Sequence, residues 1–403
     1  MIDIQQQKVV IIGHGSTSRL GIVRAVAELG CQITVIVMTW NRGKKLDTRK
    51  PYDCYSKYIT DVHYCHAKDG NGLIGLLLDK CVDPNQRVIL LPDSDFSAAT
   101  IDANRDRLAP HFLFPNLRSG SMLHWMSKQV QQSVARETGL NVVSSTVIKI
   151  TEGKFEIPAG ICYPCFTKAL VTVSGGKQLF CRCNNEEELR VQLDKIAQKQ
   201  DTDVLVEDFK NIEDEYAVLG FSDGENVIIP GVIKFVSNTV SHFGIARTGL
   251  VMPVSGFETL LDAFKEFVRS VGFRGVFDID FYNSGGSFYF GEMNLRFGGS
   301  GYSITKMGVN LPAMLIHYLR GEDYLNMNGM VKSTASYVNE RMCEDDWYRG
   351  FISTGEFNVI LDSADISFVR DNKDPKPFFV FKIIHFTRML KKSKGKIGIH
   401  SRN

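Results

Sequence analysis

The first hundred residues contain short apolar segments that alternate with a helical pattern. Residues 8–13, 32–38 and 87–92 are mostly apolar, and a helix is predicted from Leu20 to Leu29. Strands that are covered by helices on both faces have such continuous apolar patterns, and βαβ units place these strands parallel. The first part of the chain is therefore predicted to be an α/β domain with a parallel sheet.

Polar residues follow two of these strands. The turn from Gly13 to Ser18 is similar to a dinucleotide-binding loop, but Ser18 stands where a third glycine is expected and no acid follows the second strand. Asp93 and Asp95 come directly after the third apolar segment, at the edge where open α/β sheets bind ligands. These two acids are predicted either to contact a ligand or to cap the helix that begins near Ser97.

Alternating and helical patterns follow a predicted boundary near residues 115–120. Alternation predicts strands at 163–168 and 203–209. A period of 3.6 residues predicts helices at 121–138, 186–198, 256–271 and about 311–320. The chain is divided into residues 1–116, residues 117–330 and a C-terminal extension, 331–403, with a basic tail.

The most informative pattern is a predicted β-hairpin between Arg274 and Gly301. Side chains of a strand alternate between two faces, so one face collects polar and the other apolar side chains. The polar face carries Asp278, Asp280, Glu292, Asn294 and Arg296, and the apolar face carries Phe277, Ile279, Phe281, Met293 and Leu295. Carboxylate oxygens suit Mg²⁺, and an arginine there would meet the charge that develops on a transferring phosphoryl group. The alternative is a hairpin whose polar face is only solvated.

Composition limits the class of protein. The chain has 403 residues, 44% hydrophobic and 23% charged, which indicates a globular protein with two or three domains. A net charge of +2 gives no reason to expect a nucleic-acid partner. The N-terminal residues lack a signal-peptide pattern, and no apolar run approaches the roughly 20 residues that cross a bilayer. Together with nine scattered cysteines, these features predict a cytoplasmic protein.

Four cysteines form a C-x-x-C pair and a C-x-C pair that could hold zinc; they are Cys162, Cys165, Cys181 and Cys183. Both pairs lie in alternating, strand-like sequence on either side of a Gly-Gly turn. The simpler prediction is that small buried thiols pack the inside of a hairpin.

The spacing from Asp280 to Glu292-Met293-Asn294-Leu295-Arg296, followed by a run of small residues, resembles the metal-binding end of the ATP-grasp superfamily. The resemblance covers about residues 5–325. It implies an N-terminal α/β domain that helps to hold the substrate, followed by an α+β ATP-grasp fold with antiparallel sheets. It also implies that Asp280, Glu292 and Asn294 bind Mg²⁺, with Mn²⁺ as an alternative, and that Arg296 is catalytic.

The same resemblance implies contacts with the phosphates of ATP. Lys128 and Lys168 match lysines that reach the phosphates, and Lys168 is also given a catalytic role. Gly175, Gly176 and Lys177 match a glycine loop whose backbone N–H groups bind anions. The alternatives are a solvated surface lysine at position 128 and a plain β-turn in place of the loop.

Further upstream matches imply contacts with the rest of the nucleotide. Glu207, Asp208 and Phe209 match the strand that receives adenine, and Glu215 matches the acid that holds the ribose hydroxyls. Lys234 is a candidate for a phosphate or substrate contact, as is Arg247. The alternative for the acids is an acidic surface loop.

The resemblance implies an ATP-dependent carboxylate–amine ligase. Such an enzyme forms an acylphosphate and then an amide, releasing ADP and phosphate, with an amino acid expected as one substrate. The layout is most similar to D-aspartate ligases and related bacterial amino-acid ligases. The alternatives are a bicarbonate-activating enzyme and a non-catalytic ATP-binding module. Small-molecule substrates and a homodimer are expected, and the sequence does not name the carboxylate or the amine.

The C-terminal segment from Phe378 to Leu390 is apolar and basic. As a helix it would carry a basic stripe of Lys382, His385, Arg388 and Lys392, with Phe379, Ile383, Phe386 and Leu390 on other faces. Helices of this kind lie in the interface of anionic membranes, so peripheral membrane contact is one prediction. The alternative is a core strand followed by a disordered tail.

Overall fold

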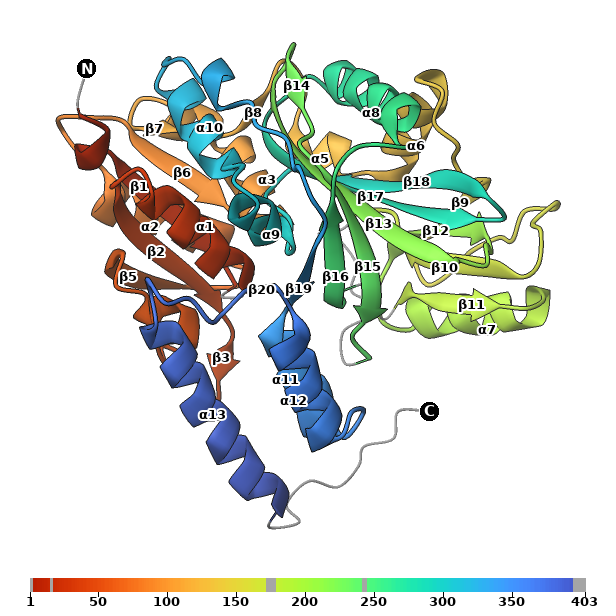
Figure 1. The fold of residues 1–403 in the computed structure, drawn as a ribbon. Coiled ribbons are helices and arrows are strands. Elements are labelled where there is room, and N and C mark those ends of the chain that lie inside the picture. The colour runs from red at the N-terminus through yellow and green to blue at the C-terminus, as the bar shows by residue number, and fades with distance from the viewer. Residues whose placement is uncertain (1–2, 15–16, 172–178, 241–244, 394–403) are drawn as a thin grey trace.

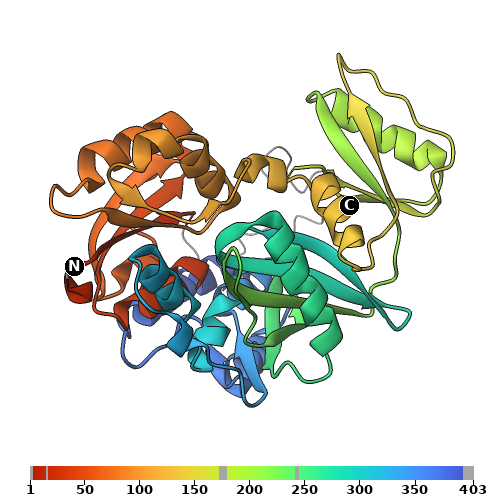
Figure 2. The same ribbon diagram turned by 90° about the horizontal axis from the view of Figure 1, so that it is seen from above.

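The computed structural model describes residues 3–14, 17–171, 179–240 and 245–393 (Figure 1). The expected glycine loop, with Gly175, Gly176 and Lys177, lies outside these ranges. A parallel sheet, a small antiparallel sheet and a large, mainly antiparallel sheet make up the fold. Figure 2 shows the N-terminal sheet on one side of the molecule and the small sheet projecting on the other.

The N-terminal sheet has the strand order β5-β2-β1-β6-β7, and each neighbouring pair is parallel. Its strands are β1 (Lys8–Gly13), β2 (Gln32–Thr39), β5 (Ile59–His66), β6 (Val88–Pro92) and β7 (Phe112–Leu113). Its helices are η1 (Ile4–Gln6), α1 (Thr17–Ala27), η2 (Tyr52–Tyr55), α2 (Gly70–Leu76), η3 (Leu77–Cys81), α3 (Asp95–Ala103) and α4 (Arg105–Leu108), and a short hairpin joins β3 (Asn41–Arg42) to β4 (Lys45–Leu46). The predicted parallel-sheet α/β unit is confirmed.

The helix predicted over residues 121–138 is in fact two helices, α5 (Met122–Trp125) and α6 (Lys128–Glu137). At the break, the backbone N–H of Lys128 donates to the carbonyl of Leu170 (2.9 Å), and Ser127 forms a β-bridge with Val171. The first N–H groups of a helix have no partner within it, so this contact suits a helix that begins at Lys128. The prediction of one helix was wrong because a distant segment pairs with the backbone there.

The small sheet has the order β11-β10-β12-β9, with antiparallel neighbours and α7 on one face. Its elements are β9 (Ser145–Ile150), β10 (Cys165–Ala169), β11 (Cys181–Cys183), α7 (Glu186–Ala197) and β12 (Thr202–Asp208). Asn185 caps α7 by accepting the backbone N–H of Glu188.

The large sheet runs β18-β17-β13-β15-β16-β19-β20, with β14 and β8 at the sides of this path. Its strands are β8 (Asn116–Leu117), β13 (Asp214–Asp223), β14 (Val227–Ile228), β15 (Val232–Asn238), β16 (Ala246–Met252), β17 (Phe273–Ser284), β18 (Ser287–Asn294), β19 (Ala335–Val338) and β20 (Ile366–Ser367). The apolar stripe of α8 (Glu258–Val271) packs on one face, as predicted. The opposite face shares a core with β1, α1 and the helices α9 (Gly301–Lys306) and α10 (Leu311–Leu319). Beyond α10 lies η5 (Leu325–Met327).

The predicted hairpin is β17 and β18, joined by a two-residue turn. Gly285 and Gly286 have φ of 60° and 73°, the positive values that this tight turn requires. A bulge at Gly291 puts Asp280 opposite Glu292 but Phe281 opposite Phe290. The extra residue lets aromatic side chains of both strands enter the core while the acids stay together on the other face.

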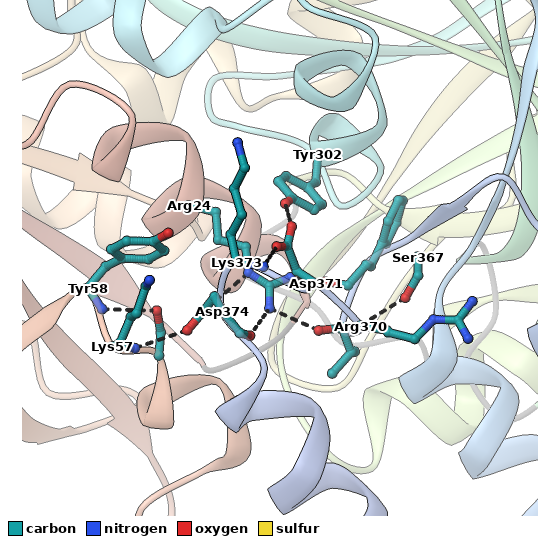
Figure 3. Close-up of polar contacts among 12 residues, drawn as sticks. Arg24, Lys57, Tyr58, Tyr302, Ser367, Arg370, Asp371, Lys373 and Asp374 are labelled. Carbon is teal, nitrogen blue, oxygen red and sulfur yellow. Dashed lines mark hydrogen bonds and ion pairs between the residues drawn. The ribbon is translucent and has the colours of Figure 1, made fainter.

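The C-terminal residues return across the molecule. After β19 come α11 (Glu340–Arg349), α12 (Thr354–Ser363), β20 and the long helix α13 (Lys376–Ser393) at the edge of the molecule (Figure 1). The segment before α13 is fastened to the N-terminal unit, because buried Arg24 donates to Asp374 Oδ2 (3.1 Å) and to the carbonyls of Phe368 and Val369 (Figure 3). Tyr302 of α9 donates to Asp371 (2.9 Å) in the same network. Among the described helices, none is long and apolar enough to span a membrane.

Candidate active site

The acids of the hairpin meet on one face of the large sheet. Asp280 lies opposite Glu292 in the strand register, and Asp278 lies opposite Asn294. The amide of Asn294 is 3.4 Å from Asp280 Oδ2. The prediction that these side chains share one face of the hairpin is confirmed. This face points toward the N-terminal unit rather than toward bulk solvent, because the neighbouring β13 residues Ala217 and Leu219 belong to the core that the large sheet shares with that unit.

The electrostatics of this face favour a cation. Burial raises the pKa of Asp280 to about 6, while the charge of Arg296 opposes that rise. Burial and then the neighbouring charge of Asp280 raise the pKa of Asp278 well above its ordinary value. The Oδ1 atom of Asp278 is buried and has no hydrogen-bond partner. Crowded, desolvated carboxylates resist ionisation, and a nearby positive charge would relieve that cost.

Arg296 connects the hairpin to the N-terminal unit. Its guanidinium donates to both oxygens of Asp95, at 2.9 and 3.3 Å, and to Asn294 Oδ1 at 3.3 Å. Burial alone would lower the pKa of Arg296, but the charge and hydrogen bond of Asp95 outweigh it and raise the pKa. The helix cap expected of Asp93 or Asp95 is supplied by Ser94, whose side chain accepts the N–H of Ser97. Asp95 is therefore left to hold the arginine.

Lys128 lies at the start of α6, and its ammonium forms an ion pair with Glu292. Only 8% of this lysine is exposed. Burial, followed by the charge of Lys168, lowers its pKa to about 8. Two lysines from different parts of the fold therefore lie near each other, and each has a carboxylate partner.

Lys168 on β10 pairs with Glu207 on β12 at 2.5 Å. The other oxygen of Glu207 accepts a hydrogen bond from the amide of Gln132 (2.7 Å), and Ser145 donates to that same amide's oxygen (2.6 Å). Glu207 is buried, so its charge is compensated by these partners. In this way α6 joins the small sheet to the acids of the large sheet.

Gln131 is a positioning residue that sequence reasoning did not identify. Its side-chain amide donates to the carbonyl of Met293 (2.8 Å) and accepts the N–H of Met293 (2.8 Å). It thus pairs with the edge strand β18 as a neighbouring strand would, between Glu292 and Asn294. The sequence signal was only two adjacent glutamines one turn after Lys128.

The segment expected to receive adenine leaves the small sheet at Asp208. The N–H of Asp208 donates to Ser144 (3.0 Å) and the N–H of Phe209 donates to Pro164 (2.9 Å). The guanidinium of Arg182 lies 4.2 Å from the centre of the Phe209 ring. These contacts hold the segment against the ends of β9 and β10.

Comparison with known proteins places the fold. No family model matches the chain. A crystal structure of an L-amino acid ligase from Bacillus licheniformis superposes with a TM-score of 0.58 at 17% identity, covering 82% of this chain and 79% of that one. An N5-carboxyaminoimidazole synthetase from Staphylococcus aureus in complex with ADP gives a TM-score of 0.60 at 14% identity, covering 83% of each chain. Both are ATP-grasp proteins.

The chain has an ATP-grasp fold. In sequence, it is 22% identical over 173 residues to a formate-dependent phosphoribosylglycinamide formyltransferase from Nitratiruptor sp., which is 42% of this chain and 43% of that protein. The match thus spans less than half the length of that relative. The predicted α/β class, with a parallel sheet followed by antiparallel sheets, is confirmed.

Within the ATP-grasp fold, the structure brings together most of the predicted residues. Lys128, Lys168, Glu207, Asp280, Glu292, Asn294 and Arg296 form a continuous set of contacts and charges across the two antiparallel sheets. Glu215 on β13 bonds to the amide of Asn238, and its charge acts on Asp280. Glu215, which the resemblance matches to the acid that holds the ribose hydroxyls, therefore lies on the same sheet face as the acids.

Two predicted residues lie apart from this set. Lys234 is in register with Tyr216, so it emerges on the sheet face opposite to Glu215, where it pairs with Asp214 (2.7 Å). Arg247 pairs with the buried Asp346 of α11 at 3.0 Å. Both side chains are engaged in contacts within the protein, away from the acids.

Two of the four cysteines of the predicted set pack the core of the small sheet of the ATP-grasp fold. Cys165 lies opposite Cys183, and both are buried in the core under α7. Burial raises the pKa of the Cys183 thiol to about 12, which disfavours the thiolate that zinc requires. Across the described ranges, no group of three or more His, Cys, Asp or Glu side chains is placed to hold a metal ion. The predicted packing role is confirmed for Cys165 and Cys183, whereas the prediction of a buried thiol was wrong for Cys162, which is exposed.

Proposed function

We propose that the protein is an ATP-dependent ligase that activates a carboxylate as an acylphosphate and joins it to an amine. The products are an amide, ADP and phosphate, and an amino acid is one substrate. The observation that carries this proposal is the joint placement of two lysines, three acids and an arginine at the place where α6 connects the small antiparallel sheet to the large one. These residues are Lys128, Lys168, Glu207, Asp280, Glu292 and Arg296. Phosphoryl transfer needs little more than positioning and such charges.

The lysines are the proposed phosphate ligands. Lys128 and Lys168 are held by Glu292 and Glu207, so their ammonium groups are already placed beside the acids. The phosphates of ATP would compete with these carboxylates for the same ammonium groups. Arg296, fixed by both oxygens of Asp95, would meet negative charge as the carboxylate attacks the γ-phosphorus.

Asp280, Glu292 and Asn294 are the proposed ligands of Mg²⁺, with Mn²⁺ as the alternative. The donor set fits a hard divalent cation, because it offers two carboxylates and an amide oxygen on one face. Nearby Asp278 has a buried Oδ1 without a hydrogen-bond partner, an oxygen that a cation beside it would stabilise. The bound cation would supply positive charge to the phosphate oxygens. The carboxyl of Asp278 lies close to Gly298, whose Cα carries no group that would collide with it.

Glu207, Asp208, Phe209 and Glu215 are the proposed contacts to adenine and ribose, and Gly175, Gly176 and Lys177 the proposed cover of the phosphates. For Lys234, the proposal of a phosphate or substrate contact requires its side chain to leave Asp214. The N-terminal sheet presents Asp93 and Asp95 at the carboxyl end of β6, which supports a substrate site at that edge.

The similarity in layout to D-aspartate ligases and the L-amino acid ligase neighbour support an amino-acid substrate. Cytoplasmic location, a homodimer and peripheral contact of the C-terminal segment with an anionic membrane are further proposals. Bicarbonate activation is the second candidate, because a 2-oxoglutarate carboxylase biotin carboxylase domain from Hydrogenobacter thermophilus, solved with bicarbonate, superposes with a TM-score of 0.61.

A phosphate-release assay tests the proposal. ATP, Mg²⁺ and pooled amino acids are supplied with and without bicarbonate, and ADP is measured as each component is withdrawn. A ligase forms ADP only when both a carboxylate and an amine are present. Stimulation by bicarbonate alone supports the second candidate, and ATP binding without turnover in any pool supports a non-catalytic module.

A further inference from the structure

The helix α13 presents an apolar stripe to solvent. The exposed fractions are 62% for Phe379, 63% for Ile383, 53% for Phe386 and 43% for Leu390. Their spacing of four, three and four residues places them on one side of the helix. Single exposed apolar side chains are common on protein surfaces. A continuous row of four large ones is typical of surfaces that bind a membrane or another protein.

The opposite side of α13 is packed on the protein. Phe381 is 1% exposed and contacts Tyr52 of η2, with ring centres 5.8 Å apart. His385 stacks on Phe357 of α12 at 4.8 Å. The orientation of the helix about its own axis is therefore set by one buried face, which leaves the apolar stripe outward.

This orientation changes the role of the predicted basic stripe. Arg388 pairs with Glu344 and Asp345 of α11, and Lys392 donates to the carbonyl of Trp347 (2.5 Å). His385 also lies on this inner face. Of the four predicted basic residues, only Lys382 is exposed, and the other three are partly buried. The segment is the helix that one of the two alternatives required, and the core-strand alternative is wrong. Most of the basic stripe of this helix binds the protein itself.

Other basic residues flank the apolar stripe. At 3.6 residues per turn, Lys382 lies on one side of it and Lys376 and Lys391 on the other, and all three are exposed. The sequence from Pro375 to Asn403 contains six lysines and two arginines and no acidic residue. Among the described residues of α13, three exposed lysines therefore flank the apolar stripe, and the helix itself carries no acidic residue.

The base of α13 is fixed to the body of the protein. Asp374 is fully buried between Arg24 and the backbone N–H of Lys57, which donates to its Oδ1 (3.0 Å) (Figure 3). Lys373 and Lys57 lie at this end of the helix and are exposed. Figure 1 shows the other end of the helix reaching away from the sheets. The stripe is thus presented at the periphery on a firmly held element.

We propose that the outer face of α13 is a docking surface for an anionic lipid bilayer. The apolar stripe would enter the interface between headgroups and acyl chains, while the flanking lysines would meet the anionic headgroups. A second copy of the chain fits less well, because pairing α13 with itself would bring these lysines together without acids to balance them. This inference deepens the proposed membrane contact and does not depend on the proposed ligase chemistry.

Co-sedimentation of the full chain with vesicles tests the proposal. At low salt, the protein should sediment with vesicles of phosphatidylcholine and phosphatidylserine and much less with phosphatidylcholine alone. Ile383→Ser with Phe386→Ser should lower the partition coefficient about tenfold or more, since apolar burial drives insertion. Lys382→Glu with Lys391→Glu should lower binding to the anionic vesicles by a similar factor.

The matched control is Val359→Ser on α12, which removes an exposed apolar side chain away from α13. It should bind vesicles as the original chain does. Circular dichroism melting checks that each variant folds; if the double serine variant does not, the lysine variant decides. The proposal is overturned if the original chain ignores anionic vesicles. It is also overturned if the chain is a dimer that the serine variant converts to a monomer. Because ATP is absent, an inactive ligase would not affect the result.

Discussion

Glu292 is the residue in which the proposed metal and phosphate roles meet. It lies opposite Asp280 and holds Lys128. Glu292→Gln keeps the shape of the side chain but removes a charged metal ligand, so ADP formation should fall about a hundredfold or more. The measurement is steady-state ADP release at saturating Mg²⁺. The matched control is Glu187→Gln, which changes an exposed glutamate on α7. Near-normal turnover in Glu292→Gln would rule out the assignment.

Lys168 and Lys128 are the two residues proposed to bind the phosphates of ATP. Replacing either lysine with Ala should weaken ATP binding about tenfold, since a charged hydrogen bond to phosphate contributes roughly 1.5–3 kcal/mol. Binding of the amine substrate should change much less. Titration calorimetry with a non-hydrolysable ATP analogue measures the change in ATP affinity. The control is Lys149→Ala, which removes an exposed lysine on β9. An equal loss of amine and ATP affinity would contradict the phosphate roles.

At the scale of elements, α6 connects the two antiparallel sheets through the side chains of two glutamines. Gln131 satisfies the backbone of Met293, and Gln132 holds Glu207. Gln131→Leu leaves the N–H and carbonyl of Met293 without partners, which should lower the free energy of unfolding by about 1–3 kcal/mol. It should also lower kcat, because Glu292 and Asn294 flank Met293.

Urea unfolding and steady-state kinetics measure these two effects of Gln131→Leu. Gln129→Leu, an exposed substitution on the same helix, should change neither. If Gln131→Leu lost stability but kept full activity, the residue would be structural only and would not position the proposed ligands.

The contact between α13 and α11 should depend on pH. Burial, and then the charges of Lys382 and Arg388, lower the pKa of His385 from its ordinary 6.5, and its nearest acid is Glu344 at 3.8 Å. A histidine that resists protonation when folded binds more protons when unfolded, so its contribution to stability is lost as pH falls through about 6.5.

Thermal unfolding measured above and below that pH checks this expectation. His385→Phe keeps a ring against Trp347 and Phe357 and should lose less stability on acidification than the original chain does. Identical pH dependence in the two proteins would show that His385 does not contribute. The comparison is made as a difference between proteins because other carboxylates also titrate at low pH.

At the scale of the whole molecule, one buried ion pair fastens the C-terminal segment to the N-terminal unit. Arg24 and Asp374 are separated by 350 residues in sequence, and both are buried. Asp374→Asn would leave Arg24 with a buried and uncompensated charge, which should cost about 3–5 kcal/mol of unfolding free energy. Chemical denaturation measures this loss.

The matched control for Asp374→Asn is Asp47→Asn, which breaks the exposed pair with Arg49 and should change stability little. An equal effect of the two substitutions would mean that the buried network does not hold the molecule together. A third possibility, loss of vesicle binding in Asp374→Asn with the global fold retained, would show that this pair mainly sets the position of α13.

The sequence alone determined the features that depend on neighbours along the chain. Period-two alternation placed Asp278 and Asp280 on one face of the hairpin, because successive side chains of any strand point to opposite sides. Continuous apolar segments predicted the parallel sheet, and the residues from Asp280 to Arg296 carry the resemblance that implied the ATP-grasp fold. These patterns are local, so one chain is enough to show them.

Only the tertiary structure decided which distant groups meet. Asp95 and Arg296 are 201 residues apart, and Lys128 and Glu292 are 164 apart, so no periodicity relates them. The break before α6 and the role of Gln131 also arise from pairing with distant backbone. For residues 378–390 the sequence left an amphipathic helix and a core strand open. In the structure this segment belongs to α13, where Phe381 is buried and Arg388 meets the buried acids of α11, so the apolar stripe faces outward. Which face of a helix is buried depends on the groups that the fold places opposite it, because a charged side chain can be buried only where a partner of opposite charge is present.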